Sequence, residues 1–139
     1  MVYIRTEKQT AVTPFTIQRV NLYPIAMPFV EILRTSFGQD PFKAGVIVEA
    51  ITSDGISGWG EASVEINPGY GAETVGTALH MLKNFLVPAV QGKTLNSPIE
   101  VPALLRSVRG NHHTKAGLEA AIWDAAAKTS HVRLADYFA

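Results

Sequence analysis

Residues 44–62 read AGVIVEAITSDGISGWGEA, two strand-like runs on either side of a single turn signal. In the first run, residues 44–52, the apolar side chains of Val46, Val48 and Ala50 recur at every second position, as on one face of a strand. Asp54-Gly55 then supplies a dipeptide typical of tight hairpins. Residues 56–62 return as a second strand. The stretch therefore predicts an antiparallel hairpin.

The flanking sequence extends this hairpin into a domain. Residues 15–25 nearly alternate apolar and polar side chains, which predicts a further strand that ends at Pro24 and Pro28. After the hairpin the period becomes helical. Helices are expected from Val75 to Pro88, from Ser97-Pro98 to about Val108, and from Thr114 to Lys128. Three antiparallel strands followed by helices predict an α+β fold.

Two long connections, residues 28–43 and 63–71, are predicted as loops. Loops of this length in a small domain are usually functional or mobile. Phe37 and Tyr70 are loop aromatics beside glycine, which fits a cover over an apolar substrate about as well as it fits a satellite of the core. Arg34 could hold a carboxylate in a bidentate fork or remain solvated.

Composition excludes several classes of function. The chain has 139 residues with 12 Lys+Arg and 12 Asp+Glu, so its formal net charge is zero. Non-specific electrostatic binding to nucleic acid or to an anionic membrane is therefore not expected. With no cysteine, disulfides and thiol catalysis are excluded. There is no signal-peptide or membrane-spanning run, so a cytoplasmic location is expected.

No catalytic or metal-binding group is predicted in this chain. His112 and His113 are adjacent but lack further ligands at workable spacing. Glu61 ends a strand, and a structural role that holds the strand end is favoured over acid–base work with Glu65. Gly58 and Gly60 do not form a nucleotide loop and are interpreted as sites of close backbone approach.

Several motifs together resemble a known family. They are residues 58–62 (GWGEA), 68–70 (PGY) with Glu73-Thr74, 109–111 (RGN) and 115–124 (KAGLEAAIWD). This set resembles the N-terminal capping domain of the enolase superfamily, in its muconate-lactonizing subgroup. The loop 33–38 (LRTSFG) is similar to that of o-succinylbenzoate synthases that also act as N-acylamino acid racemases. The segment 1–13 is short, polar and without a period, so a flexible tail is expected there. The resemblance implies a capping domain over 14–130 and, over 131–139, the start of a connection to a barrel domain.

The resemblance also implies where substrate would lie. In the family, two loops of the capping domain close the top of a (β/α) barrel, and here they correspond to about 28–40 and 63–71. An apolar wall and a polar edge around a small carboxylate substrate are implied. The wall would be Leu33, Phe37, Ile66 and Tyr70, and the edge Arg34 and Ser36.

The chemistry implied by the family belongs to the barrel, which this chain does not contain. There, Mg²⁺ and lysines serve proton abstraction α to a carboxylate, leading to dehydration in menaquinone biosynthesis or to racemisation. The intact parent is therefore expected to be a Mg²⁺-dependent enzyme and a homo-oligomer, whereas this fragment alone is expected to be inactive. Helix 114–128, apolar on both sides, is expected to pack on the barrel and to leave an apolar patch without it.

Two alternatives remain open from the sequence. One keeps the superfamily and makes the chain the capping domain of a dipeptide epimerase or a muconate cycloisomerase. The other makes it a stand-alone binding or assembly module without catalysis.

Overall fold

The computed structural model describes residues 13–36 and 38–137. The tail expected over 1–13 lies, up to residue 12, outside the described residues. Phe37 and the last two residues of the expected connection, 138–139, lie outside them as well. No helix in the described ranges is long and apolar enough to cross a membrane.

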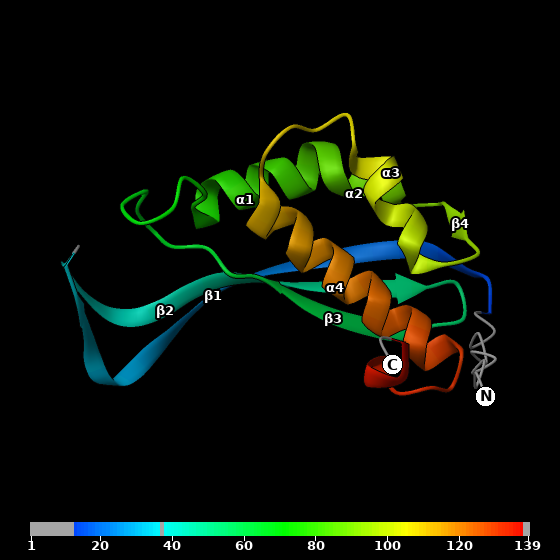
Figure 1. Cartoon of the computed structure of the whole chain (residues 1–139), viewed down its shortest axis with the longest axis horizontal. Helices are drawn as coiled ribbons and strands as arrows, with labels where there is room; N and C mark the ends of the chain where they lie inside the picture. The colour runs from blue at the N-terminus through cyan, green and yellow to red at the C-terminus, as the bar shows by residue number, and fades with distance from the viewer. Residues whose placement is uncertain (1–12, 37, 138–139) are drawn as a thin grey trace, which may run out of the picture.

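The sheet is built from an antiparallel meander of three strands (Figure 1). They are β1 (Phe15–Thr35), β2 (Gly38–Thr52) and β3 (Ser57–Ala62). A two-residue strand, β4 (Thr94–Leu95), pairs with the start of β1, so the order is β3-β2-β1-β4. Between β2 and β3 the chain turns at Gly55, whose φ of +80° is available to glycine at little cost. The predicted meander and the α+β class are confirmed.

The helices follow the meander and cover one face of the sheet (Figure 1). They are α1 (Val75–Met81), a π-helical turn (Leu82–Leu86), α2 (Val87–Val90), a 3₁₀ turn (Pro98–Glu100), α3 (Val101–Leu105), α4 (His112–Thr129) and α5 (Leu134–Tyr137). The first predicted helix does not end at Pro88, since it continues to Val90. Pro88 lies in the first turn of α2, directly after the π-helical turn, where a missing N–H is tolerated. The second ends earlier than predicted, at Leu105.

The core lies between the helices and the inner face of the sheet. Val46, Val48 and Ala50 are fully buried there, as the alternating pattern predicts. From the helical side the core receives large aliphatic side chains, among them Leu82, Leu86, Leu118 and Ile122.

Helix α4 is buried on one side by this chain itself. Leu118, Ala121, Ile122 and Ala125 have no exposed surface, because α4 and β3 approach closely at Gly58, where an added Cβ would lie 2.1 Å from the backbone oxygen of Ala121. On the other side Ala116 and Ala120 are exposed, so packing of this helix on a barrel domain stays a prediction. The predicted role of Gly58 and Gly60 as sites of close backbone approach is therefore confirmed.

Residues 28–43 are not a loop, which corrects the sequence-based prediction. β1 runs on to Thr35, β2 starts at Gly38, and the two form a hairpin arm that projects from the body (Figure 1). Pro24 and Pro28 do not end β1, because beyond the short pairing with β4 this strand lies at the edge of the sheet, where proline is tolerated. The register shifts between Pro28 and Leu33, where the arm is irregular.

Candidate functional site

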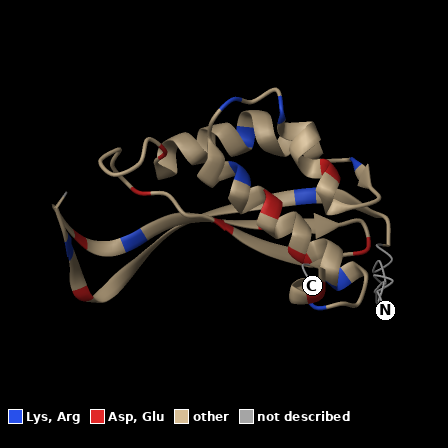
Figure 2. Cartoon of the chain, in the orientation of Figure 1, with Lys and Arg blue, Asp and Glu red and all other residues tan. Residues whose placement is uncertain are grey.

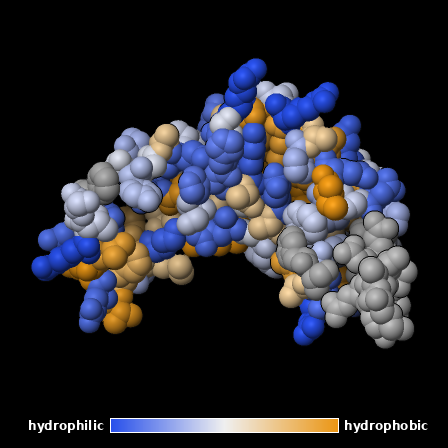
Figure 3. Space-filling view, viewed as in Figure 1, coloured by the Kyte–Doolittle hydropathy of each residue, from blue (hydrophilic) through white to orange (hydrophobic). Residues whose placement is uncertain are grey.

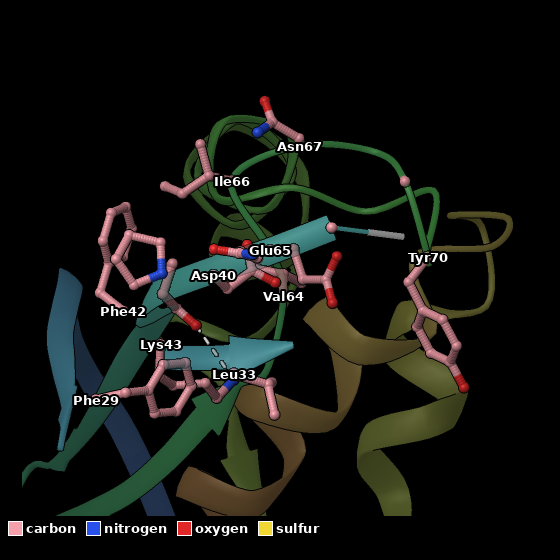
Figure 4. Close-up of a pocket in the computed structure, with 15 residues that line it drawn as sticks. Phe29, Leu33, Asp40, Phe42, Lys43, Val64, Glu65, Ile66, Asn67 and Tyr70 are labelled. Carbon is pink, nitrogen blue, oxygen red and sulfur yellow. Dashed lines mark hydrogen bonds between the residues drawn. The ribbon is translucent and has the colours of Figure 1, made fainter. Parts of the chain in front are cut away.

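A hollow of about 450 Å³ opens between the hairpin arm and the segment that follows β3, hereafter the 63–74 loop (Figure 4). Both segments lie at the same end of the sheet, to the left in Figure 1. The apolar lining comes from Phe29, Leu33, Phe42, Val64, Ile66 and Tyr70. Asp40, Lys43, Glu65 and Asn67 add polar side chains. Such a mixture is typical of sites for small organic molecules.

The two ends of the 63–74 loop are joined at its base. Glu65 and Thr74 form a β-bridge, and the N–H of Val75 donates to the carbonyl oxygen of Glu65 at 2.8 Å. Thr74 also caps α1, because its hydroxyl oxygen accepts from the N–H of Thr77. The loop therefore leaves the body and returns to it at the same hydrogen-bonded base.

Glu73 connects the same loop to the start of α4. Its two carboxylate oxygens accept from the N–H of His113 at 3.0 Å, and from the N–H and hydroxyl of Thr114 at 2.9 and 2.6 Å. Partial burial favours the protonated form of Glu73, but these hydrogen bonds outweigh it and lower the pKa of the carboxyl group.

Lys43 joins the hairpin arm to the beginning of the loop. Its Nζ lies 3.3 Å from Glu61 Oε1 and donates to Ser63 Oγ at 2.7 Å and to the carbonyl oxygen of Ala44 at 3.2 Å. Glu61 therefore holds the end of β3 against β2, in agreement with its predicted structural role. The ammonium charge at the base of the hollow is already paired.

The structure places the predicted substrate-binding residues in two groups. Leu33, Ile66 and Tyr70 line the hollow, whereas Arg34 and Ser36, near the tip of the arm, are not among the lining residues. Phe37 lies outside the described residues.

Phe29, Phe42 and Val64 line the hollow but were missed by the sequence prediction. Phe42 could have been found, because it continues the alternation of Ala44, Val46 and Val48 back into the arm. Phe29 follows Pro28 in the irregular part of the arm, so no regular period marks it.

Asp40, Lys43 and Glu65 give the lining of the hollow charges of both signs, and Figure 2 shows acidic and basic residues along the arm. Within residues 13–36 and 38–137, no three His, Asp or Glu side chains gather as a metal site would require. The residues present do not fit the Mg²⁺ implied by the family, so no step of the chemistry is assigned to a metal on this chain.

A second polar cluster lies on the opposite, open face of the sheet. Glu49 accepts from Asn21 Nδ2 at 2.9 Å, Tyr23 Oη at 2.8 Å and Ser57 Oγ at 2.8 Å. The Tyr23 ring stacks on Trp59 with centroids 6.1 Å apart. The hydrogen bonds from Asn21, Ser57 and Tyr23 lower the pKa of Glu49. This cluster lies outside the hollow, and its contacts join β1, β2 and β3.

The chain is similar to known proteins over nearly its whole length. Residues 12–138 match the family model described as mandelate racemase / muconate lactonizing enzyme, N-terminal domain. An o-succinylbenzoate synthase from Bacillus subtilis is 43% identical over 120 residues, which cover 86% of this chain and 32% of that protein. An N-succinylamino acid racemase from Amycolatopsis is 34% identical over 106 residues, covering 76% of this chain and 28% of that protein.

A solved structure gives the same result in three dimensions. A member of the enolase superfamily from Listeria innocua matches this chain with a TM-score of 0.85 and 31% identity, and the match covers 89% of this chain and 33% of that one. The chain therefore spans about a third of the length of the curated relatives it matches.

Proposed function

This chain belongs to the mandelate racemase / muconate lactonizing enzyme N-terminal domain family, and we propose that it is the substrate-capping domain of an o-succinylbenzoate synthase or N-acylamino acid racemase. The observation that carries the proposal is the hollow between the hairpin arm and the 63–74 loop, two segments distant in sequence that meet at one end of the sheet. The similarity to a synthase and to a racemase supports the choice of substrate class.

The role of this chain in that reaction is to cover and orient the substrate. Phe29, Leu33 and Phe42 from the arm line the hollow together with Ile66 and Tyr70 from the loop. In the proposed enzyme these side chains exclude water from the apolar part of a small carboxylate substrate. Arg34 and Ser36, near the tip of the arm, are proposed as the polar edge of the same site, and Phe37 is proposed as part of its apolar wall.

The proton transfer itself is assigned to a C-terminal barrel domain. When bound there, Mg²⁺ would stabilise the negative charge that develops on the carboxylate as its α proton is removed. Loss of water would complete the synthase reaction, and return of the proton to the other face would complete the racemase reaction. This chain alone is therefore proposed to be inactive. A cytoplasmic location and a homo-oligomeric parent stay predictions.

The test is to join this chain to the C-terminal two thirds of the B. subtilis synthase and to assay dehydration and racemisation with Mg²⁺. We expect activity in the joined protein and none in this chain. Phe29→Ala should raise KM, because it opens the wall of the hollow. Phe85→Ala, an exposed aromatic on the π-helical turn, is the matched control and should leave KM unchanged.

A folded joined protein that neither dehydrates nor racemises would refute the substrate assignment. In that case activity on a dipeptide or on muconate would identify one of the other capping-domain assignments. Inactivity on every substrate would favour the stand-alone module.

A further inference from the structure

We propose that Glu73 is a positioning residue, whose carboxylate fixes the 63–74 loop to the N-terminus of α4 and thereby holds Ile66 and Tyr70 opposite the hairpin arm. The effect of this positioning on substrate binding rests on the proposed function. The positioning itself is a property of this chain and can be tested without substrate.

The start of α4 leaves backbone donors that its own cap does not satisfy. The first N–H groups of any helix lack intrahelical partners. The N-cap residue Asn111 adopts a left-handed conformation, with φ 55° and ψ 45°, and its side chain makes no capping hydrogen bond. Its amide donates instead to the carbonyl oxygen of Arg109 at 3.0 Å.

Glu73 supplies the cap that Asn111 does not. Its carboxylate accepts hydrogen bonds from the N–H groups of His113 and Thr114, although Glu73 lies about forty residues earlier in the chain. A negative carboxylate at this end also interacts favourably with the dipole of an 18-residue helix. Because Thr114 is fully buried, the third hydrogen bond, from its hydroxyl, is shielded from water.

The tip of the loop is exposed, and within it the N–H of Gly69 donates to the carbonyl oxygen of Asn67 at 2.9 Å. The bridge between Glu65 and Thr74 joins its ends, but an added Cβ at Gly69 or Gly71 would meet nothing within 4 Å, and Tyr70 is 79% exposed. The hydrogen bonds of Glu73, one residue before that bridge, fix the direction in which the loop leaves the body.

The experiment measures order in the loop of this chain under native conditions. Chymotrypsin should cleave after Tyr70, and the amides of residues 66–72 can be followed by hydrogen exchange. In Glu73→Ala we expect both rates to rise on the order of tenfold, the size of effect that follows loss of a helix cap. Glu73→Gln should be intermediate, since its amide oxygen still accepts from Thr114 while its NH₂ group faces the N–H of His113.

Asp124→Asn is the matched control. Asp124 is a second carboxylate that joins α4 to another element, since it accepts from the N–H of Trp59 at 2.9 Å and pairs with Lys128 at 2.7 Å. Its removal should leave cleavage after Tyr70 unchanged. Equal rates in Glu73→Ala and Asp124→Asn would overturn the proposal, as would faster exchange spread evenly over the domain.

A milder variant keeps the test valid if Glu73→Ala does not fold. Thr114→Val preserves shape and removes only the hydroxyl donor, so it should raise cleavage after Tyr70 in the same direction by a smaller factor. No change in Thr114→Val would contradict the proposal. The joined enzyme gives a separate reading: Glu73→Ala should raise KM more than it lowers kcat, whereas absence of activity in the unmutated joined enzyme would count against the proposed function only.

Discussion

Three glycines set how closely α4 can lie on β3. An added Cβ would lie 2.1 Å from the oxygen of Ala121 at Gly58, 2.2 Å from the oxygen of Gly117 at Gly60, and 2.4 Å from the nitrogen of Ala62 at Gly117. These are contacts with backbone, which cannot rotate away. The spacing of helix and strand therefore depends on the absence of three side chains.

Gly58→Ala should destabilise the protein by about 3 kcal/mol or more, because the helix must move away from the strand to admit one methyl group. Gly71→Ala is the control, since nothing lies within 4 Å of its Cβ position, and it should stay within about 0.5 kcal/mol of the parent. Urea denaturation of the three proteins measures both values. Similar midpoints for the two variants would show that α4 and β3 can separate freely.

Glu49 makes the stability of the protein depend on pH. Its pKa is lowered from the ordinary value of 4.5 by hydrogen bonds from Asn21, Ser57 and Tyr23. The unfolded chain therefore binds a proton at a higher pH than the folded one. The stabilisation by Glu49 is complete above pH 4.5 and is lost as the pH falls below that value toward the folded-state pKa.

Glu49→Gln should accordingly lose less stability than the parent when the pH falls from neutral to below 4.5. The comparison is between denaturation midpoints at the two pH values. Glu31→Gln, on the exposed hairpin arm, is the control and should keep the pH dependence of the parent. If Glu49→Gln keeps it as well, the three hydrogen bonds do not favour the ionised carboxylate.

The hairpin arm is an element with little core of its own. Met27, Val30, Ile32, Leu33 and Phe42 are all exposed on it, and apolar surface appears at this end of the molecule in Figure 3. Its two strands are held to each other by backbone pairing, and Lys43 joins the arm to the end of β3 through Glu61. This construction suits an element whose side chains face a ligand or a neighbouring domain instead of the core.

Shortening the arm tests this view. Met27 pairs with Lys43, so an Asn-Gly turn between them can replace residues 28–42 without changing the register of the body. The free energy of unfolding should stay within about 1 kcal/mol of the parent, since the removed side chains lie outside the core. Loss of cooperative unfolding in the shortened protein would show instead that the arm supports the core.

Helix α4 also protects the outer edge of β3. The N–H of Trp59 donates to Asp124, and Lys128 Nζ donates to the carbonyl oxygen of Ser57 at 2.9 Å. Backbone groups at an edge strand otherwise offer a template for pairing with another chain. One helix thus covers both the inner face and the free edge of the strand.

At the scale of the whole molecule, sheet and helices share one core. Val46 and Val48 from β2, Ile17 from β1 and Ile122 from α4 belong to the same buried cluster. The predicted likeness to the enolase-superfamily capping domain is confirmed at this scale, over residues 12–138. A domain with one shared core should unfold as a unit.

The two tryptophans can report on this from different layers. Trp59 lies on the open face of the sheet against Tyr23, and Trp123 lies on α4 against Tyr137, with ring centroids 5.6 Å apart. In Trp59→Phe and Trp123→Phe, the remaining fluorophore should give the same midpoint as circular dichroism of that variant. A helical signal that melts apart from the fluorescence of Trp59 would mean that the layers unfold separately.

The meander, the order of the elements and the buried faces of β2 and α4 could all be predicted from local sequence patterns. These features depend on the side-chain period within a strand or helix and on the turn preference of Asp54-Gly55. Both are interactions between residues close together in the sequence. The sequence also carried the family resemblance, through motifs such as Gly58–Ala62.

The remaining features come from contacts between residues far apart in the sequence. Residues 28–35 and 38–43 become strands because they pair with each other. Proline disfavours a strand locally, but an edge strand tolerates it. The hollow, the cap that Glu73 places on α4, and the close contact of α4 with β3 at Gly58 all join residues tens of positions apart. No local period encodes such contacts, since they exist only after the elements have packed.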